Sequence, residues 1–149
     1  TYGAHTGAST QLGFAPETYL PICADMPVLL LGGSEDGVIV SSATRYGTES
    51  QPDTPLRMTF QRAIVGASGD RYFAIVRGAS RFTVVHPADP TAGRAFLDRP
   101  AIGDEAELRR VMADAVCAFL DGYVRTDVES RGVLERVLSG PSFATFERK

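Results

Sequence analysis

The stretch PVLLLG, residues 27–32, decides the fold class of this chain. It is a short, unbroken apolar run that ends in glycine, and such runs are typical of strands buried on both faces of a parallel sheet. A second run of this kind, RYFAIVRG at 71–78, predicts a second buried strand. The segment 38–47 predicts a helix between them, and the apolar pattern of 56–65 favours another. Strands that alternate with helices predict an α/β fold with a parallel sheet.

The strongest helical pattern lies in the last third of the chain. Over residues 104–124 apolar side chains recur at every third or fourth position, which predicts an amphipathic helix packed on the sheet. Acidic residues in its first turn suit the positive end of the helix dipole. A second, shorter helix is predicted at about 130–138, because Gly140 and Pro141 form an ordinary helix stop.

The predicted sheet is too small to be complete. Only the two runs above have the pattern of full strands, and the segment TYGAHTG at 1–7 resembles the end of a third strand with its exit loop. A parallel sheet needs both faces covered and its edges protected. We therefore expect residues 1–149 to form the C-terminal portion of a single domain, whose remaining strands come from an N-terminal segment or from a partner chain.

Composition argues against several classes of protein. The 149 residues are 44% hydrophobic and 22% charged, as in ordinary globular proteins, and the net charge of -3 favours neither nucleic acid nor an anionic membrane as a partner. No apolar run approaches the roughly 20 residues that span a bilayer. The first residues lack a secretory signal pattern, so we expect a cytoplasmic protein, with secretion directed by an upstream signal left open.

The cysteines and histidines predict no metal centre. Cys23 and Cys117 are far apart and lack the spacing of a metal motif, so we expect two small, buried apolar residues. The chain contains only 2 histidines, His5 and His86, which are too few for a histidine-rich metal site. Neither a metal nor another cofactor is expected.

Three loops are expected to meet at one edge of the sheet. They are 3–7, 34–37 and 78–86, and each follows the carboxyl end of a predicted strand. Ligands of open α/β sheets bind at this edge. An acidic residue on one strand end and a histidine after the next is also the chain order of the acid and base of an α/β-hydrolase triad. The candidate residues on these loops are His5, Asp36, Arg81 and His86.

Two stretches carry a family resemblance. PVLLLGGSEDGVI at 27–39 and AIVRGASRFTVVHPADPTAGRAFLD at 74–98 resemble the C-terminal half of α/β-hydrolases of the dienelactone hydrolase and lipase-like kind. YGAHTG at 2–7 is similar to the strand that follows the nucleophile in that family. The resemblance covers nearly the whole chain, and it implies an enzyme that hydrolyses an ester, a lactone or an amide.

The resemblance implies that Asp36 is the acid of a catalytic triad, where it would orient a histidine and stabilise its protonated form. The loop could also place the neighbouring Glu35 in that position. A turn aspartate that only caps the helix beginning at Val38 is the alternative interpretation.

The chain departs from the family at the base of the triad. The family turn has the pattern G-A-x-H-F, whereas GASRF here puts Arg81 in the place of the histidine. Arginine stays protonated at any working pH and cannot act as a general base. Arg81 would instead pair with Asp36 or hold an anionic group of a substrate. His86 is the substitute base if its loop folds back to Asp36, and otherwise a structural or surface histidine. His5 is a further candidate for the substrate site.

The nucleophile of the family is not found in this chain. No G-x-S-x-G elbow occurs, so a serine nucleophile would lie on an N-terminal α/β-hydrolase fragment, the partner that the resemblance implies. Thr1 falls inside what should be a strand, and one explanation is a precursor cleaved before Thr1 whose two pieces stay together. A threonine hydroxyl can attack its preceding carbonyl, and its freed amine can act as a base. Thr1 is therefore a candidate autoproteolytic processing site.

Three functions remain open from the sequence. The first is a serine hydrolase or esterase that acts on a small molecule, as a heterodimer with the nucleophile on the partner fragment. The second is a non-hydrolytic relative, such as a cyclase or lyase-like biosynthetic enzyme, which is consistent with Arg81. The third is a catalytically inactive binding subunit.

Overall fold

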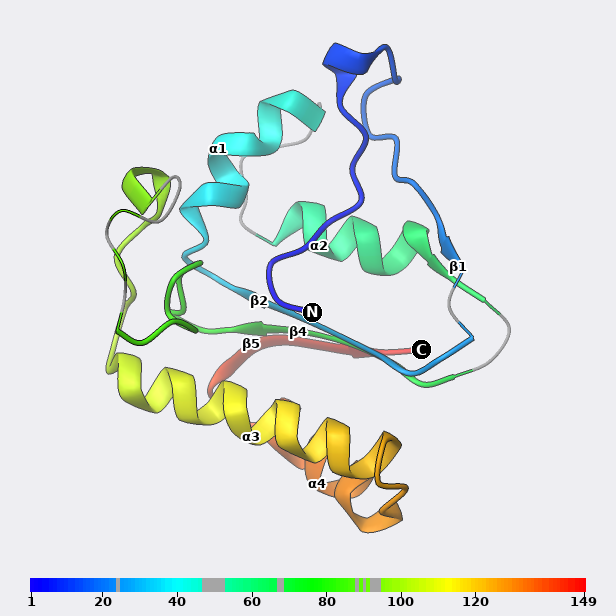
Figure 1. The fold of residues 1–149 in the computed structure, drawn as a ribbon, viewed down its shortest axis with the longest axis vertical. Coiled ribbons are helices and arrows are strands. Elements are labelled where there is room, and N and C mark those ends of the chain that lie inside the picture. Colours follow the sequence, from blue (N-terminus) through cyan, green and yellow to red (C-terminus); the bar gives the residue numbers. More distant parts are fainter. Residues whose placement is uncertain (24, 47–52, 67–68, 88, 90, 92–94) are drawn as a thin grey trace.

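The computed structural model describes residues 1–23, 25–46, 53–66, 69–87, 89, 91 and 95–149. It is a mixed α/β structure in which helices cover both faces of a small sheet (Figure 1). In chain order the elements are η1 (Thr10–Leu12), β1 (Ile22–Cys23), β2 (Val28–Gly33), α1 (Gly37–Tyr46), α2 (Thr54–Met58), η2 (Thr59–Ala63), β3 (Ile64–Val65), β4 (Arg71–Val76), η3 (Ala95–Leu97), α3 (Glu105–Tyr123), α4 (Val128–Leu138) and β5 (Phe143–Arg148).

The two apolar runs form the parallel strand pair that the sequence predicts. β2 and β4 lie side by side with Leu30 opposite Phe73. All six residues of β4 are buried, as are all of β2 except its first. A strand covered on both faces can be apolar at every position, which explains the unbroken runs. The predicted helix at 56–65 is present as α2 and the π-helical η2, although its last two residues form β3.

The sheet differs from the predicted all-parallel arrangement at one edge. β5 pairs antiparallel with β4, with Phe73 opposite Glu147 and Val76 opposite Phe143, and a register irregularity lies between Ile75 and Val76. The main chains of Lys149 and Arg71 exchange hydrogen bonds of 2.9 and 3.0 Å at the far end of this pair. The prediction that only the two apolar runs form full strands was therefore wrong, since the chain itself supplies a third strand and the sheet is mixed.

The N-terminal residues line the other edge of the sheet, as predicted. Tyr2 forms a parallel bridge with Leu31. The Leu31 N–H donates to the carbonyl of Thr1 at 2.8 Å, and the Gly3 N–H donates to the carbonyl of Leu31 at 2.8 Å. The described part of the sheet thus runs from the N-terminal segment through β2 and β4 to β5.

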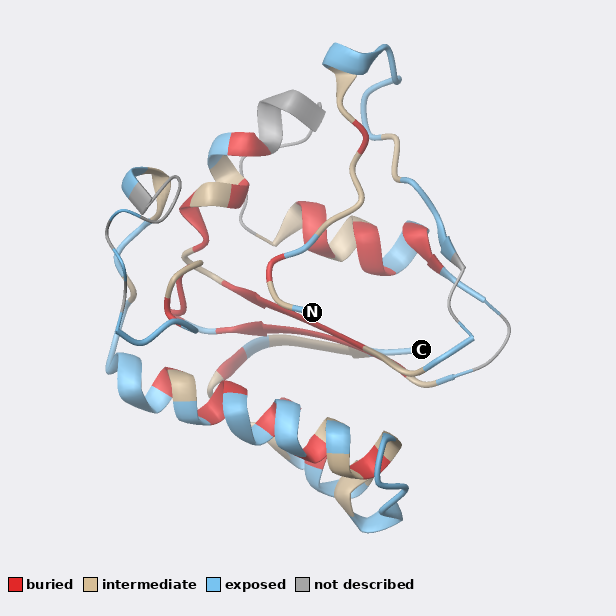
Figure 2. Cartoon of the chain, viewed as in Figure 1, coloured by how far each residue is buried: buried red, intermediate tan, exposed pale blue. Residues whose placement is uncertain are grey.

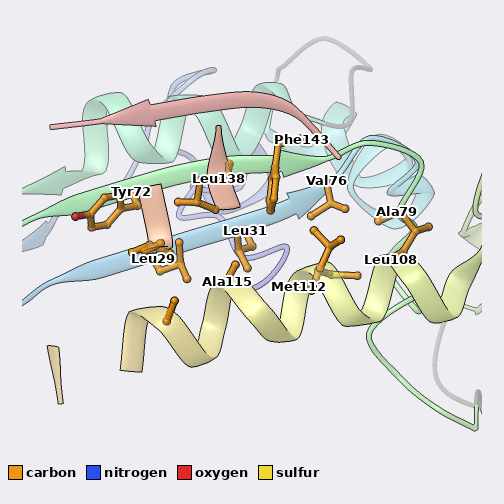
Figure 3. Close-up of a cluster of buried hydrophobic side chains, with 14 residues drawn as sticks. Leu29, Leu31, Tyr72, Val76, Ala79, Leu108, Met112, Ala115, Leu138 and Phe143 are labelled. Carbon is orange, nitrogen blue, oxygen red and sulfur yellow. The ribbon is translucent and has the colours of Figure 1, made fainter. Parts of the chain in front are cut away.

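The core lies in two layers, one on each face of the sheet (Figure 2). Successive residues of a strand point to opposite faces, so Leu29 and Leu31 face α3 and α4 while Leu30 faces α1 and α2. Figure 3 shows the first layer, in which Leu108, Met112 and Ala115 of α3 pack under the sheet. Each fully buried large apolar side chain contributes about 2 kcal/mol relative to an exposed one.

The long helix α3 begins where the sequence predicts. The carboxylate of Asp104 accepts a hydrogen bond from the Ala106 N–H at 2.9 Å, which caps the helix. Cys117 on this helix is exposed, so the expectation of a buried residue was wrong for that cysteine. Cys117 lies on the face of α3 that is exposed to solvent. No helix in the described part of the chain is long and apolar enough to cross a membrane.

Candidate functional site

The candidate site lies beyond the carboxyl ends of β2 and β4, and Asp36 is its buried acid. β2 ends at Gly33, the chain turns through Ser34 and Glu35, and Asp36 comes directly before α1. Asp36 is 1% exposed, and its Oδ1 accepts a hydrogen bond from the Ile39 N–H at 3.0 Å. Asp36 therefore also caps α1, the alternative that the sequence left open.

Glu35 has a different environment. It is half-buried, and its Oε1 accepts a hydrogen bond of 2.9 Å from the hydroxyl of the adjacent Ser34. The Ser34 hydroxyl oxygen in turn accepts the Gly78 N–H at 2.8 Å, which ties the turn after β2 to the turn after β4. Of the two neighbouring carboxylates, Asp36 is the one held inside the structure.

Arg81 supplies the charge that faces Asp36. Its Nε lies 3.2 Å from Asp36 Oδ2, and its side chain is 24% exposed. The N–H is not aligned for a hydrogen bond, so the contact is an ion pair. Burial raises the pKa of Asp36, while the Ile39 N–H and the positive charge of Arg81 act in the opposite direction. The sequence prediction that Arg81 pairs with Asp36 is thus the arrangement in the structure.

Asp98 is a third member of the site, and no pattern in the sequence indicated it. Its Oδ1 accepts hydrogen bonds from the Gly37 N–H at 3.0 Å and the Arg81 N–H at 3.2 Å, and its Oδ2 accepts the Phe82 N–H at 3.1 Å. The Asp98 carboxylate thereby connects the loop after β2 with the loop after β4. Asp98 is 61 residues from Gly37 and 17 residues from Arg81 in the sequence. All three donors are backbone groups, which leave no pattern in the sequence that could have predicted the role of Asp98.

The N-terminal segment packs directly on the ion pair. The Tyr2 hydroxyl donates to the carbonyl of Ser80 at 2.6 Å, and burial raises the pKa of Tyr2. Gly3 has a φ of 58°, and a Cβ built there would lie 2.3 Å from Arg81 Nη1 and 3.1 Å from Asp36 Oδ2. The left-handed backbone conformation therefore favours glycine at this position, and the guanidinium occupies the space that a Cβ would take.

His5 lies two residues after Gly3 on the N-terminal segment, and its role in a substrate site remains a prediction. It is half-buried, and its Nδ1 accepts a hydrogen bond from the Gly7 N–H at 3.2 Å. Burial, and to a smaller extent the positive charge of Arg81, lower the pKa of His5. A lowered pKa keeps the imidazole neutral at pH 7, and an accepting Nδ1 leaves the proton on Nε2.

His86 and Thr1 lie outside this cluster. His86 is exposed, and the side chain of Asp36 is engaged by the Ile39 N–H and by Arg81. The Thr1 amine donates to the carbonyl of Leu29 at 2.5 Å, at the first half of β2 rather than beyond its end, and partial burial lowers the pKa of that amine. The roles of His86 as a base and of Thr1 as a processing site remain predictions.

An apolar hollow adjoins the cluster. Its volume is about 90 Å³, and its walls include Ala4, His5, Thr6, Val28, Leu30 and Thr59. No group of three or more metal-ligating side chains gathers among the residues that the structure describes. What the arrangement offers is a fixed positive charge, a neutral imidazole and a small apolar space, all suited to binding a small organic molecule.

Comparison of the chain with protein-family models, with curated proteins and with solved structures gives no match.

Proposed function

We propose that this chain is the C-terminal portion of an α/β-hydrolase-like domain that binds a small anionic molecule without hydrolysing it. The observation that carries the proposal is the ion pair between Arg81 and Asp36. A triad acid needs a partner that can accept and release a proton, and a guanidinium cannot do so at any working pH. The same guanidinium has further N–H donors, and its partial exposure leaves them within reach of a ligand.

The electrostatics of the cluster fit a binding role. Arg81 offsets the charge of Asp36, and Asp98 is engaged by three backbone N–H groups. An incoming carboxylate or phosphate would compete with Asp36 for Arg81, and the buried Asp36 already has a raised pKa. Binding of an anion would therefore favour protonation of Asp36, so that affinity for the anion rises as the pH falls.

The N-terminal hydrolase fragment is part of the same proposal. The carbonyl of Thr1 and the N–H of Gly3 are hydrogen-bonded to Leu31 of β2. Because main-chain groups alternate in direction along a strand, the N–H and the carbonyl of Tyr2 point away from β2, toward the open edge of the sheet. A further strand would pair there. This geometry supports a partner segment that extends the sheet at this edge and completes the pocket around Arg81.

The test of the binding function is an anion titration of the chain. Acetate is titrated at low ionic strength and followed by the NMR shifts of the backbone amides in the loop 78–82, which the wild type and both variants retain. We expect saturable binding that Arg81→Gln weakens at least tenfold. Arg77→Gln is the matched control, because Arg77 is an exposed arginine that directly follows β4, four residues before Arg81. Equal weakening by both variants, or no saturable binding by the wild type, would reject the binding function.

Hydrolysis of an ester, lactone or amide is the second candidate. The observation that favours it is the position of Asp36, buried at a strand end and oriented by the Ile39 N–H as a triad acid must be. This reaction requires His86 to reach Asp36 and a serine on the partner fragment. Labelling of the complete protein by a fluorophosphonate, with turnover of a p-nitrophenyl ester that His86→Ala abolishes, would establish it over the binding function.

A further inference from the structure

One residue in the wall of the apolar hollow has a buried hydroxyl that no described residue hydrogen-bonds. The Thr6 N–H donates to Thr59 Oγ1 at 3.0 Å, which fixes the two threonines side by side. Thr6 Oγ1 is itself buried and makes no hydrogen bond in the part of the chain that the structure describes. Both residues line the hollow. A buried hydroxyl without a partner is unfavourable, so a ligand that supplies a hydrogen-bond acceptor there would gain affinity.

The size of the hollow limits what enters it. A dry cavity of about 150 Å³ accepts benzene, with six heavy atoms. The volume of about 90 Å³ therefore corresponds to roughly three or four heavy atoms. The polar members of the wall are Thr1, His5, Thr6 and Thr59. The other wall residues are aliphatic, namely Ala4, Ile22, Val28, Leu30 and Ile64. A short alkyl chain matches both the space and the lining.

The positive charge of the site lies next to this hollow. The Arg81 guanidinium rests against Gly3, and the following two residues, Ala4 and His5, form part of the wall. An extended chain covers about 7 Å over two residues, so the guanidinium and the wall are close enough for one small molecule to contact both. The positive charge of Arg81 also lowers the pKa of His5, which agrees with this proximity.

We infer that the hollow holds the alkyl chain of a short carboxylic acid of about four carbons, whose carboxylate accepts from Arg81 and from the Thr6 hydroxyl. The inference rests on the proposed anion-binding function and names its ligand class. The hollow selects ligands by chain length, Arg81 contributes the charge, and Thr6 gains a hydrogen bond that no described residue supplies.

The experiment compares four probes by calorimetric titration of the chain: acetate, butyrate, octanoate and neutral 1-butanol. Two additional buried methylenes correspond to about fifteenfold in affinity, so butyrate should bind at least tenfold more tightly than acetate. Octanoate should bind no more tightly than butyrate because the hollow is filled. Butanol should bind at least tenfold more weakly than butyrate because it lacks the charge.

Two variants test the hollow itself. Ala4→Leu fills it from an exposed wall position, and the preference for butyrate over acetate should disappear while acetate binding persists. Ala113→Leu, at another exposed alanine, this one on α3, is the matched control and should keep the preference. Thr6→Val should weaken butyrate about fivefold while it raises the melting temperature, since it removes an unpaired buried hydroxyl.

The outcomes separate the inference from the function on which it rests. Equal binding of acetate and butyrate, unchanged by Ala4→Leu, would overturn the alkyl pocket and leave the anion site in place. Butanol binding as tightly as butyrate would overturn the carboxylate. A Thr6→Val variant with unchanged butyrate affinity would remove Thr6 from the site. Failure of every anion to bind the wild type would reject both the inference and the proposed function.

Discussion

Arg81 Nε lies 3.2 Å from Asp36 Oδ2, across the ends of two neighbouring parallel strands. An imidazole at position 81 would lie beside the same carboxylate. In Arg81→His we expect the pKa of the new histidine to be raised above its usual value of about 6.5, because the negative charge of Asp36 favours the protonated form. The raised value implies extra stability that is fully present below the unfolded pKa and is lost as the pH rises through the folded pKa. Proton NMR of the imidazole signals, with His5 and His86 as internal references, measures the pKa. A new histidine that titrates below 6.5 would show that the carboxylate does not reach it.

Asp98 holds two loops through three backbone N–H groups. We expect Asp98→Ala to lower the free energy of unfolding by about 2–3 kcal/mol, since each hydrogen bond contributes about 1 kcal/mol. Asp104→Ala is the control, because it removes a single helix cap on α3 and should cost about 1 kcal/mol. Urea denaturation gives both values. Equal costs in the two variants would contradict the clamping role of Asp98.

Gly33 and Gly132 offer a matched pair of glycine substitutions. A Cβ at Gly33 would lie 2.1 Å from the carbonyl oxygen of Ala79 and 2.8 Å from the Tyr2 hydroxyl. The nearest atom to a Cβ at Gly132, in α4, is 3.5 Å away on a flexible arginine. Gly33→Ala should therefore destabilise the protein by about 1–3 kcal/mol, and Gly132→Ala should stabilise it by up to about 1 kcal/mol. Thermal denaturation of both variants checks the opposite signs, and a stabilising Gly33→Ala would refute the close packing of the two strand ends.

Tyr123 and Asp70 form a hydrogen bond that links stability to pH. The Tyr123 hydroxyl donates to Asp70 Oδ2 at 2.5 Å. This bond, followed by the contact with Arg148, lowers the pKa of Asp70. A lowered folded pKa contributes stability above the unfolded value of about 3.9, and that stability is lost as the pH falls through the folded value. Tyr123→Phe should cost about 1 kcal/mol at pH 7 and less at pH 2.

Tyr19→Phe is the control for this pH dependence. The Tyr19 hydroxyl is buried and makes no hydrogen bond among the described residues, so its removal should not destabilise the protein at either pH. Denaturant unfolding at pH 7 and pH 2 gives the four values. A cost for Tyr123→Phe that stays the same at both pH values would disprove the linkage to Asp70.

The parallel strand pair and the two long helices could be predicted from the sequence because their patterns are local. An unbroken apolar run identifies a doubly buried strand, and a period of three to four identifies α3. The antiparallel strand β5 has no such signal. Only its first residue, Phe143, is buried, and its partner β4 lies about 70 residues upstream. Its pairing depends on tertiary contacts that a short mixed segment does not reveal.

The candidate site also has residues that the sequence predicts and one that it does not. Asp36 and Arg81 could be placed because each follows a recognisable strand, so their proximity is a consequence of the parallel sheet. Asp98 lies in a loop without periodicity and acts on backbone N–H groups, which every residue type possesses. Its contribution could not be predicted without coordinates.

β4 lies between a parallel neighbour, β2, and an antiparallel one, β5, with helices over both faces. The peptide groups of Phe73 and Ile75 face β5 and those of Ala74 face β2, so these amides meet solvent only when a neighbouring strand separates beneath its covering helices. Their deuterium uptake should be the slowest in the described chain and should report the global free energy of unfolding. The amides of the N-terminal segment, held on one side only, should exchange by local opening. A single exchange experiment would thus distinguish detachment of the edge that carries Gly3 from unfolding of the whole sheet.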